Sequence, residues 1–203
     1  MPHVGGDVGY ADMDDAVARS LLQSNGVGLD GDSLIAELER KPEVLAAAAA
    51  RVLGAEGERR AADRLRELAH GRGDSLRAEA AYALARMDDP DGVPALKETL
   101  ELPFEAYVAP MQAAGSLARL GDPSGAPVIE RALRSSNDVI RMVACKQLLH
   151  FVPLHDADLG GGRRLDAWGL FDRALHDRDS GIAAQARLQL RELEAPEARD
   201  RLR

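Results

Sequence analysis

Two long segments of this 203-residue sequence repeat one another at an offset of 33 residues. Both segments, 77–100 and 110–133, contain paired alanines, an Asp-Pro dipeptide, a second proline and apolar residues in the same places. The aligned pairs are Ala80/Ala113, Ala81/Ala114, Leu84/Leu117, Met87/Leu120, Asp89/Asp122, Pro90/Pro123, Pro94/Pro127, Leu96/Ile129 and Leu100/Leu133. A period of this length is typical of a solenoid, in which each repeat buries its apolar face against the next.

Weaker copies of the pattern extend the repeat in both directions, so that repeats are expected over residues 43–193. A glycine-rich insertion at 152–165 delays the second helix of one copy. Upstream, residues 11–42 are expected to form an irregular N-terminal cap, and residues 1–10 a disordered tail. The predicted organisation is one solenoid domain over residues 11–203.

The composition favours helices throughout. Aromatic residues make up only 3 % of the chain, too few to fill the core of a β-sandwich. Paired alanines let two helices approach closely, Asp-Pro ends the first helix of a pair, and Gly92 and Gly125 are expected to supply flexibility before the second. The expected fold is all-α, a right-handed α-α superhelix of about eleven helices.

Together with Arg77 and Arg141 of the first helices, these repeats resemble the HEAT-repeat family, in particular the short bacterial HEAT-like repeats also found in phycobiliprotein lyases. The resemblance covers about residues 43–193 and implies an α-solenoid. Most members of the family are interaction scaffolds and a minority are enzymes, so the fold alone does not decide the function. The sequence lacks the His-Glu pairs of the di-iron hydroxylases and the basic, aromatic cleft of the HEAT-like alkylpurine DNA glycosylases.

Charge and segment composition exclude several further classes. The net charge is −8 and no segment carries a basic excess, which makes nucleic-acid binding unfavourable. Neither a stretch of 18 apolar residues nor a signal peptide can be read, so we expect no membrane association and a cytoplasmic protein. The resemblance to short bacterial HEAT-like repeats implies a bacterial protein.

Few residues are candidates for catalysis or metal binding. The lone Cys145 takes a paired-alanine position and is expected to be a small core side chain. His150, His155, Asp156 and Asp158 lie within nine residues, but their spacing fits no known metal cage. We therefore expect no catalytic residue, metal or cofactor.

The candidate binding residues lie on the second helices, which are expected to line the concave surface as in HEAT-like solenoids. Cationic or titratable side chains gather there in the C-terminal half at Arg131, Arg134, Arg173 and His176. Because the arginine fork suits carboxylates, these residues indicate a site for an acidic segment of a protein partner. The alternative interpretation is a set of solvated helix faces.

Two tyrosines, Tyr82 and Tyr107, are candidate interface anchors. The function expected from these features is a non-catalytic protein-protein interaction scaffold that binds a partner in its concave groove. An enzyme or cofactor-lyase subunit on the same scaffold is the alternative, and a DNA-binding HEAT-like protein is less favoured.

Overall fold

A computed structural model describes residues 13–40, 42–71, 74–103 and 108–202 of the chain. The helices that open each pair are α1 (Asp15–Ser24), α3 (Glu43–Glu56), α5 (Asp74–Arg86), α7 (Ala109–Arg119), α9 (Asp138–Gln147) and α11 (Ser180–Glu192). The helices that close each pair are α2 (Gly31–Glu37), α4 (Ala62–Ala69), α6 (Gly92–Leu100), α8 (Ala126–Ala132), α10 (Ala167–Leu175) and α12 (Pro196–Arg201). The 3-10 helices are η2 (Arg59–Ala61), η3 (Pro123–Gly125) and η4 (Leu148–Leu154).

The all-α solenoid is confirmed for the described residues, which contain twelve α-helices and no extended strand. The additional helix is α12, which starts at Pro196 and buries Ala198 completely. It gives the last repeat a second helix beyond residues 43–193, over which the repeats were expected. The expected tail at residues 1–10 lies outside the described residues.

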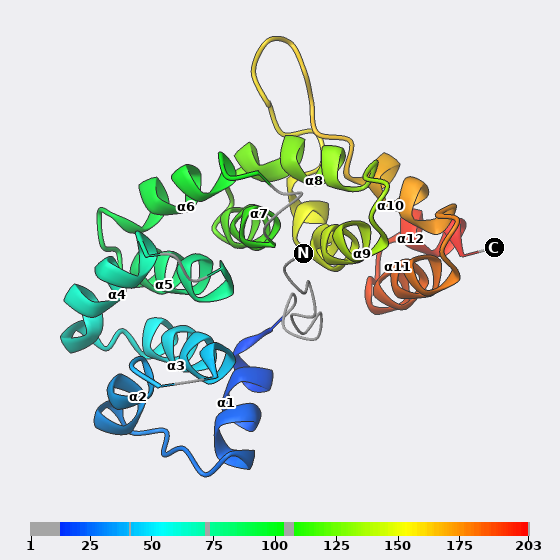
Figure 1. The fold of residues 1–203 in the computed structure, drawn as a ribbon. Coiled ribbons are helices and arrows are strands. Elements are labelled where there is room, and N and C mark those ends of the chain that lie inside the picture. Colours follow the sequence, from blue (N-terminus) through cyan, green and yellow to red (C-terminus); the bar gives the residue numbers. More distant parts are fainter. Residues whose placement is uncertain (1–12, 41, 72–73, 104–107, 203) are drawn as a thin grey trace.

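The helix pairs stack into an arc in which the first helices line the inner side and the second helices the outer side (Figure 1). The expectation that the second helices line the concave surface is therefore wrong. The cause is the spacing of the first helices, which pack directly against one another while neighbouring second helices touch little. A Cβ on Gly54 of α3 would lie only 2.6 Å from Ala83 Cα of α5, so glycine at this position permits the approach. Close spacing shortens that side of the stack and makes it concave.

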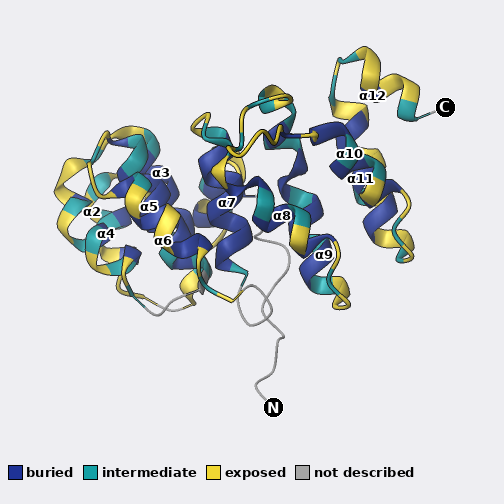
Figure 2. Ribbon diagram, turned by 90° about the horizontal axis from the view of Figure 1, so that it is seen from above, coloured by how far each residue is buried: buried dark blue, intermediate teal, exposed yellow. Residues whose placement is uncertain are grey.

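The core runs along the interior between the two rows of helices, and exposed residues gather in the turns and on the second helices (Figure 2). Leu84 and Leu117 are fully buried, as their equivalent positions in the repeat predict. Cys145 is also fully buried, which confirms its expected role as a core side chain.

The glycines that precede the second helices serve close packing, which corrects the expected role in flexibility. A Cβ on Gly125 would lie 2.5 Å from Ala114 Cα, and one on Gly92 would lie 2.5 Å from Ala85 Cα. Neither glycine has a positive φ. The two helices of a pair cross at these glycines, because a larger residue would meet the backbone of the first helix.

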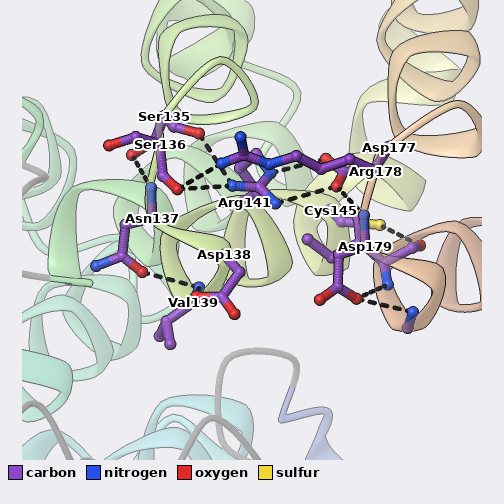
Figure 3. A network of polar contacts seen from close by, with 12 residues as sticks. Ser135, Ser136, Asn137, Asp138, Val139, Arg141, Cys145, Asp177, Arg178 and Asp179 are labelled. Atoms are coloured by element: carbon purple, nitrogen blue, oxygen red, sulfur yellow. Dashed lines mark hydrogen bonds and ion pairs between the residues drawn. The ribbon is translucent and has the colours of Figure 1, made fainter.

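Arg141 of the first helix α9 ties neighbouring helix pairs together (Figure 3). Arg141 donates from Nε and Nη2 to the Asp177 carboxylate at 2.8 and 3.1 Å, and from Nη1 to the carbonyls of Ser135 and Ser136 at 3.1 Å. Burial opposes ionisation of Asp177, but hydrogen bonds from Arg141 and the Asp179 amide outweigh it and lower the pKa of Asp177. These bonds fix the loops at the ends of α8 and α10 to α9.

Candidate functional site

Charged side chains on the outer face form a ladder of ion pairs between successive repeats. Arg66 of α4 lies 2.6 Å from the carboxylate of Asp89, and Lys97 of α6 lies 2.9 Å from that of Asp122. Both carboxylates belong to the Asp-Pro turns of the following helix pair. Partial burial opposes their ionisation, but hydrogen bonds from Arg66 and Lys97 help to keep the pKa of each below its usual range. The second-helix cations Arg66 and Lys97 are thus paired within the chain.

The ladder reverses its sign at α8, where Glu130 occupies the place of the cation. Its two carboxylate oxygens accept from Arg134 at 2.7 Å and from Arg163 at 3.3 Å. Arg163 belongs to the insertion, which reaches back over the outer face at this step. The outer face at α8 therefore differs from that at α4 and α6 in two ways: an anion replaces the cation, and an insertion with two arginines follows.

Part of the insertion forms a short hairpin rather than an irregular loop. The Leu159 amide donates to the Arg163 carbonyl at 2.9 Å, and the Asp156 amide donates to the Leu165 carbonyl at 2.9 Å. At the tip, residues 160–162 have φ values of +80°, +62° and +76°, which glycine adopts at no steric cost. The hairpin projects from the outer face beside α8 and α10 (Figure 1).

A cleft of about 360 Å³ opens between α8, α10 and this hairpin. We call it the arginine cleft, and its cationic lining residues are Arg134, Arg163, Arg164 and Arg173. Its lining contains two carboxylates, those of Glu130 and Asp166. Four cations against two anions give the cleft a formal charge of +2, opposite in sign to the whole chain.

The internal bonds of the arginine cleft hold its cations in place without neutralising them. Arg134 and Arg163 share the single carboxylate of Glu130, and their side chains are 54 % and 59 % exposed. The Asp166 carboxylate caps α10 by accepting from the Gly169 amide at 2.9 Å. Arg173 is exposed and has no ion pair with a carboxylate among the described residues.

The structure brings together only part of the candidate set. Arg134 and Arg173 line the arginine cleft, whereas Arg131 and His176 are exposed on the outer face and do not line it. The ring of His176 lies 2.8 Å from the Asp172 carbonyl. Tyr107 lies outside the described residues. The binding roles of all these residues stay predictions.

Tyr82 is not an exposed anchor, because its side chain is only 7 % exposed. It lies on α5, on the inner side of the arc, under the guanidinium groups of Arg51, Arg86 and Arg119. The repeat alignment could have indicated two of these arginines, since Arg86 and Arg119 are separated by the 33-residue period.

Other reactive side chains have inert surroundings. Burial raises the pKa of Cys145 to about 12, which keeps its sulfur in the thiol form. Within the described part of the chain, no group of three or more His, Cys, Asp or Glu side chains is arranged to hold a metal ion.

The HEAT-repeat family matches residues 31–109, from the start of α2 to the start of α7. This part of the chain is similar to HEAT repeats. The match includes the helix pairs α3/α4 and α5/α6, whose first helices pack directly against each other. The sequence matches no curated protein, and none of the described helices has both the length and the apolar character needed to cross a membrane.

Solved structures of helical repeats are similar to the chain at low identity. One is the CpcE–CpcF complex of phycocyanin lyase from Nostoc, with 19 % identity, a TM-score of 0.48 and coverage of 94 % of this chain and 79 % of that one. Another is a designed armadillo repeat protein in complex with a (KR)4 peptide, with 12 % identity, a TM-score of 0.46 and coverage of 90 % and 87 %. An engineered protein has 16 % identity, a TM-score of 0.46 and coverage of 95 % and 87 %.

Proposed function

We propose that this HEAT-repeat chain is a non-catalytic scaffold that binds an acidic segment of a protein partner in the arginine cleft. The observation that supports this function is the convergence of Arg134, Arg163, Arg164 and Arg173 on one cleft of an acidic chain. The concave groove is not the site of this proposal, because Arg134 and Arg173 lie on the outer face.

The chemistry of the cleft suits carboxylates. A guanidinium presents parallel N–H donors that match the two oxygens of a carboxylate, and such charge-assisted bonds are stronger than neutral ones. Inside the cleft, the Glu130 carboxylate accepts one charge-assisted hydrogen bond from each of Arg134 and Arg163. A partner carboxylate beside Arg173 would extend the same arrangement.

The proposal is tested with a fluorescein-labelled octaglutamate peptide, whose binding is followed by fluorescence anisotropy at 0.1 M salt. We expect the variant Arg134→Glu/Arg173→Glu to bind at least about tenfold more weakly, because two cations become anions within the cleft. Its melting temperature should stay close to that of the unmodified protein.

The matched control is Arg187→Glu/Arg191→Glu on α11, where both arginines are exposed and do not line the cleft. It changes the net charge of the chain by the same amount and should retain peptide binding to within about twofold, because salt screens distant charges. An equal loss in both variants, or no binding by the unmodified protein, contradicts the proposal.

A further inference from the structure

A second cavity, of about 550 Å³, lies on the inner side of the arc and shares no lining residue with the arginine cleft. Its lining comes from α1, α3, α5, α7, η4 and α11, so it spans most of the concave surface. Tyr82 forms part of its wall, with the guanidinium carbon of Arg51 at 4.9 Å and that of Arg86 at 5.6 Å from the ring centroid. We call this cavity the inner pocket.

One wall of the inner pocket is fixed by a buried ion pair. The Arg51 side chain is 2 % exposed and lies 2.8 Å from the carboxylate of Glu79, which is 5 % exposed. Glu79 thereby balances the charge of Arg51, and Asp15 Oδ1 lies 3.9 Å from Arg51 Nη1. The other cation on this wall, Arg86, pairs with a carboxylate that is more exposed than that of Glu79.

The partner of Arg86 is Asp15, which reaches it from α1 across 71 residues of sequence. Arg86 donates from Nη1 to both carboxylate oxygens of Asp15, at 2.8 and 2.9 Å. The Asp15 side chain is 40 % exposed and that of Arg86 is 24 % exposed, so water reaches both groups. The Nε and Nη2 groups of Arg86 donate no hydrogen bond to the described residues.

We infer that the inner pocket is a carboxylate-binding site, which Asp15 occupies in the free protein and which an aspartate or glutamate side chain of a protein partner can take over. The geometry shows the recognition directly, since a carboxylate is already seated on Arg86 beside Tyr82. Because the Asp15 side chain is partly exposed, an external carboxylate can compete with it for Arg86. The anionic side chains of Asp14 and Glu192 also line the pocket and oppose a doubly charged phosphate more strongly than a carboxylate.

The affinity of the inner pocket for an external carboxylate should depend on Asp15, which competes for Arg86. An internal carboxylate that occupies Arg86 in nine of ten molecules weakens the apparent affinity for an external carboxylate by about tenfold. Removing the charge of Asp15 should therefore strengthen binding. This inference is independent of the proposed function, because it uses no residue of the arginine cleft.

The test uses N-acetyl-aspartate amide, a capped residue that presents one carboxylate, in NMR titrations of the unmodified protein, Asp15→Asn and Asp15→Asn/Arg86→Gln. We expect Asp15→Asn to bind this probe at least about tenfold more tightly than the unmodified protein, and the double variant to lose that gain. Asp15→Asn should not increase the affinity for N-acetyl-asparagine amide, which has no carboxylate. Asp15→Asn should increase the affinity for inorganic phosphate less than the affinity for the aspartate probe.

The matched control is Glu56→Gln, which breaks the ion pair between Glu56 of α3 and Arg19 of α1. This pair is also 2.8 Å long, but neither residue lines the inner pocket. It should leave probe binding unchanged. If Asp15→Asn does not fold, Asp15→Ser removes the same charge and carries the same expectation. A folded charge-removal variant that binds no more tightly than the unmodified protein overturns the inference, as does a gain that survives Arg86→Gln.

Discussion

The guanidinium of Arg141 donates hydrogen bonds to four oxygen atoms, two of the Asp177 carboxylate and the carbonyl oxygens of Ser135 and Ser136. The Arg141 and Asp177 side chains are only 5 % and 7 % exposed. Removal of one charge from such a pair leaves the other buried without compensation, which is the costly case for ion pairs.

We expect Asp177→Asn to lower the free energy of unfolding by about 3 kcal/mol at pH 7. Because the pKa of Asp177 is lowered in the folded protein, its contribution is complete above the unfolded pKa of about 3.9 and is lost as the pH falls through the folded value. Urea unfolding at pH 7 and at pH 3 checks this. The gap between the variant and the unmodified protein should be smaller at pH 3, and an equal gap at both contradicts the account.

Core positions of the repeat could be predicted from the sequence, because apolar periodicity records which face of a helix is buried. Leu84 and Leu117 illustrate this, since both are fully buried. Tyr82 could not be placed in the same way. Its equivalents in other repeats are Gly115, Lys146 and Leu188. The 33-residue period relates Arg86 to Arg119, but it does not place them with Arg51 over the tyrosine ring.

Truncation of Leu84 or Leu117 to alanine should therefore have similar consequences. Each change should lower the free energy of unfolding by about 2–5 kcal/mol, through lost burial and the cavity left behind. Chemical denaturation of the two variants measures this directly. A cost below about 0.5 kcal/mol for either would show that the repeats are not equivalent.

At the scale of elements, the spacing of the first helices sets the curvature. The alanine pairs indicated close approach of helices, but the sequence did not show that this approach is concentrated along one row. Assignment of the concave side depends on the difference in spacing between two rows, which no single repeat contains. Analogy with other HEAT-like solenoids gave the wrong side, and with it the wrong surface for Arg134 and Arg173.

Gly54 tests the close spacing of α3 and α5. A methyl group there would lie 2.6 Å from Ala83 Cα and 2.8 Å from its Cβ, so the two helices would have to separate. We expect Gly54→Ala to lower the free energy of unfolding by about 1–3 kcal/mol, although alanine favours helix more than glycine does. Thermal unfolding measures the change, and a stabilised variant would contradict the packing described.

At the scale of the whole molecule, the arc separates two polar sites of different character. The arginine cleft on the outer face has an excess of cations over the carboxylates that line it, whereas Asp15 already pairs with a cation of the inner pocket. The sequence pointed to cations in the C-terminal half, and it could not show that Arg163 and Arg164 of the insertion join Arg134 and Arg173. The four arginines come together only because the hairpin folds back beside α8.

Binding at the arginine cleft should depend on salt, because the cations there are largely exposed. Screening acts over about 10 Å at 0.1 M salt and over shorter distances as the concentration rises. We expect the dissociation constant of the octaglutamate peptide to rise by at least about fivefold between 0.05 and 0.3 M sodium chloride. Anisotropy titrations over this range check it, and a constant affinity would indicate an uncharged mode of binding.

Hydrogen–deuterium exchange of the unmodified protein, with and without the octaglutamate peptide, tests the central claim most directly. The peptide should slow exchange in the hairpin at 156–165 and in α10, the elements that carry Arg163, Arg164 and Arg173. The inner helices α3 and α5 should exchange as they do without peptide. Protection confined to α3, α5 and α7, with the hairpin unchanged, would contradict the account and place the acidic segment on the concave side.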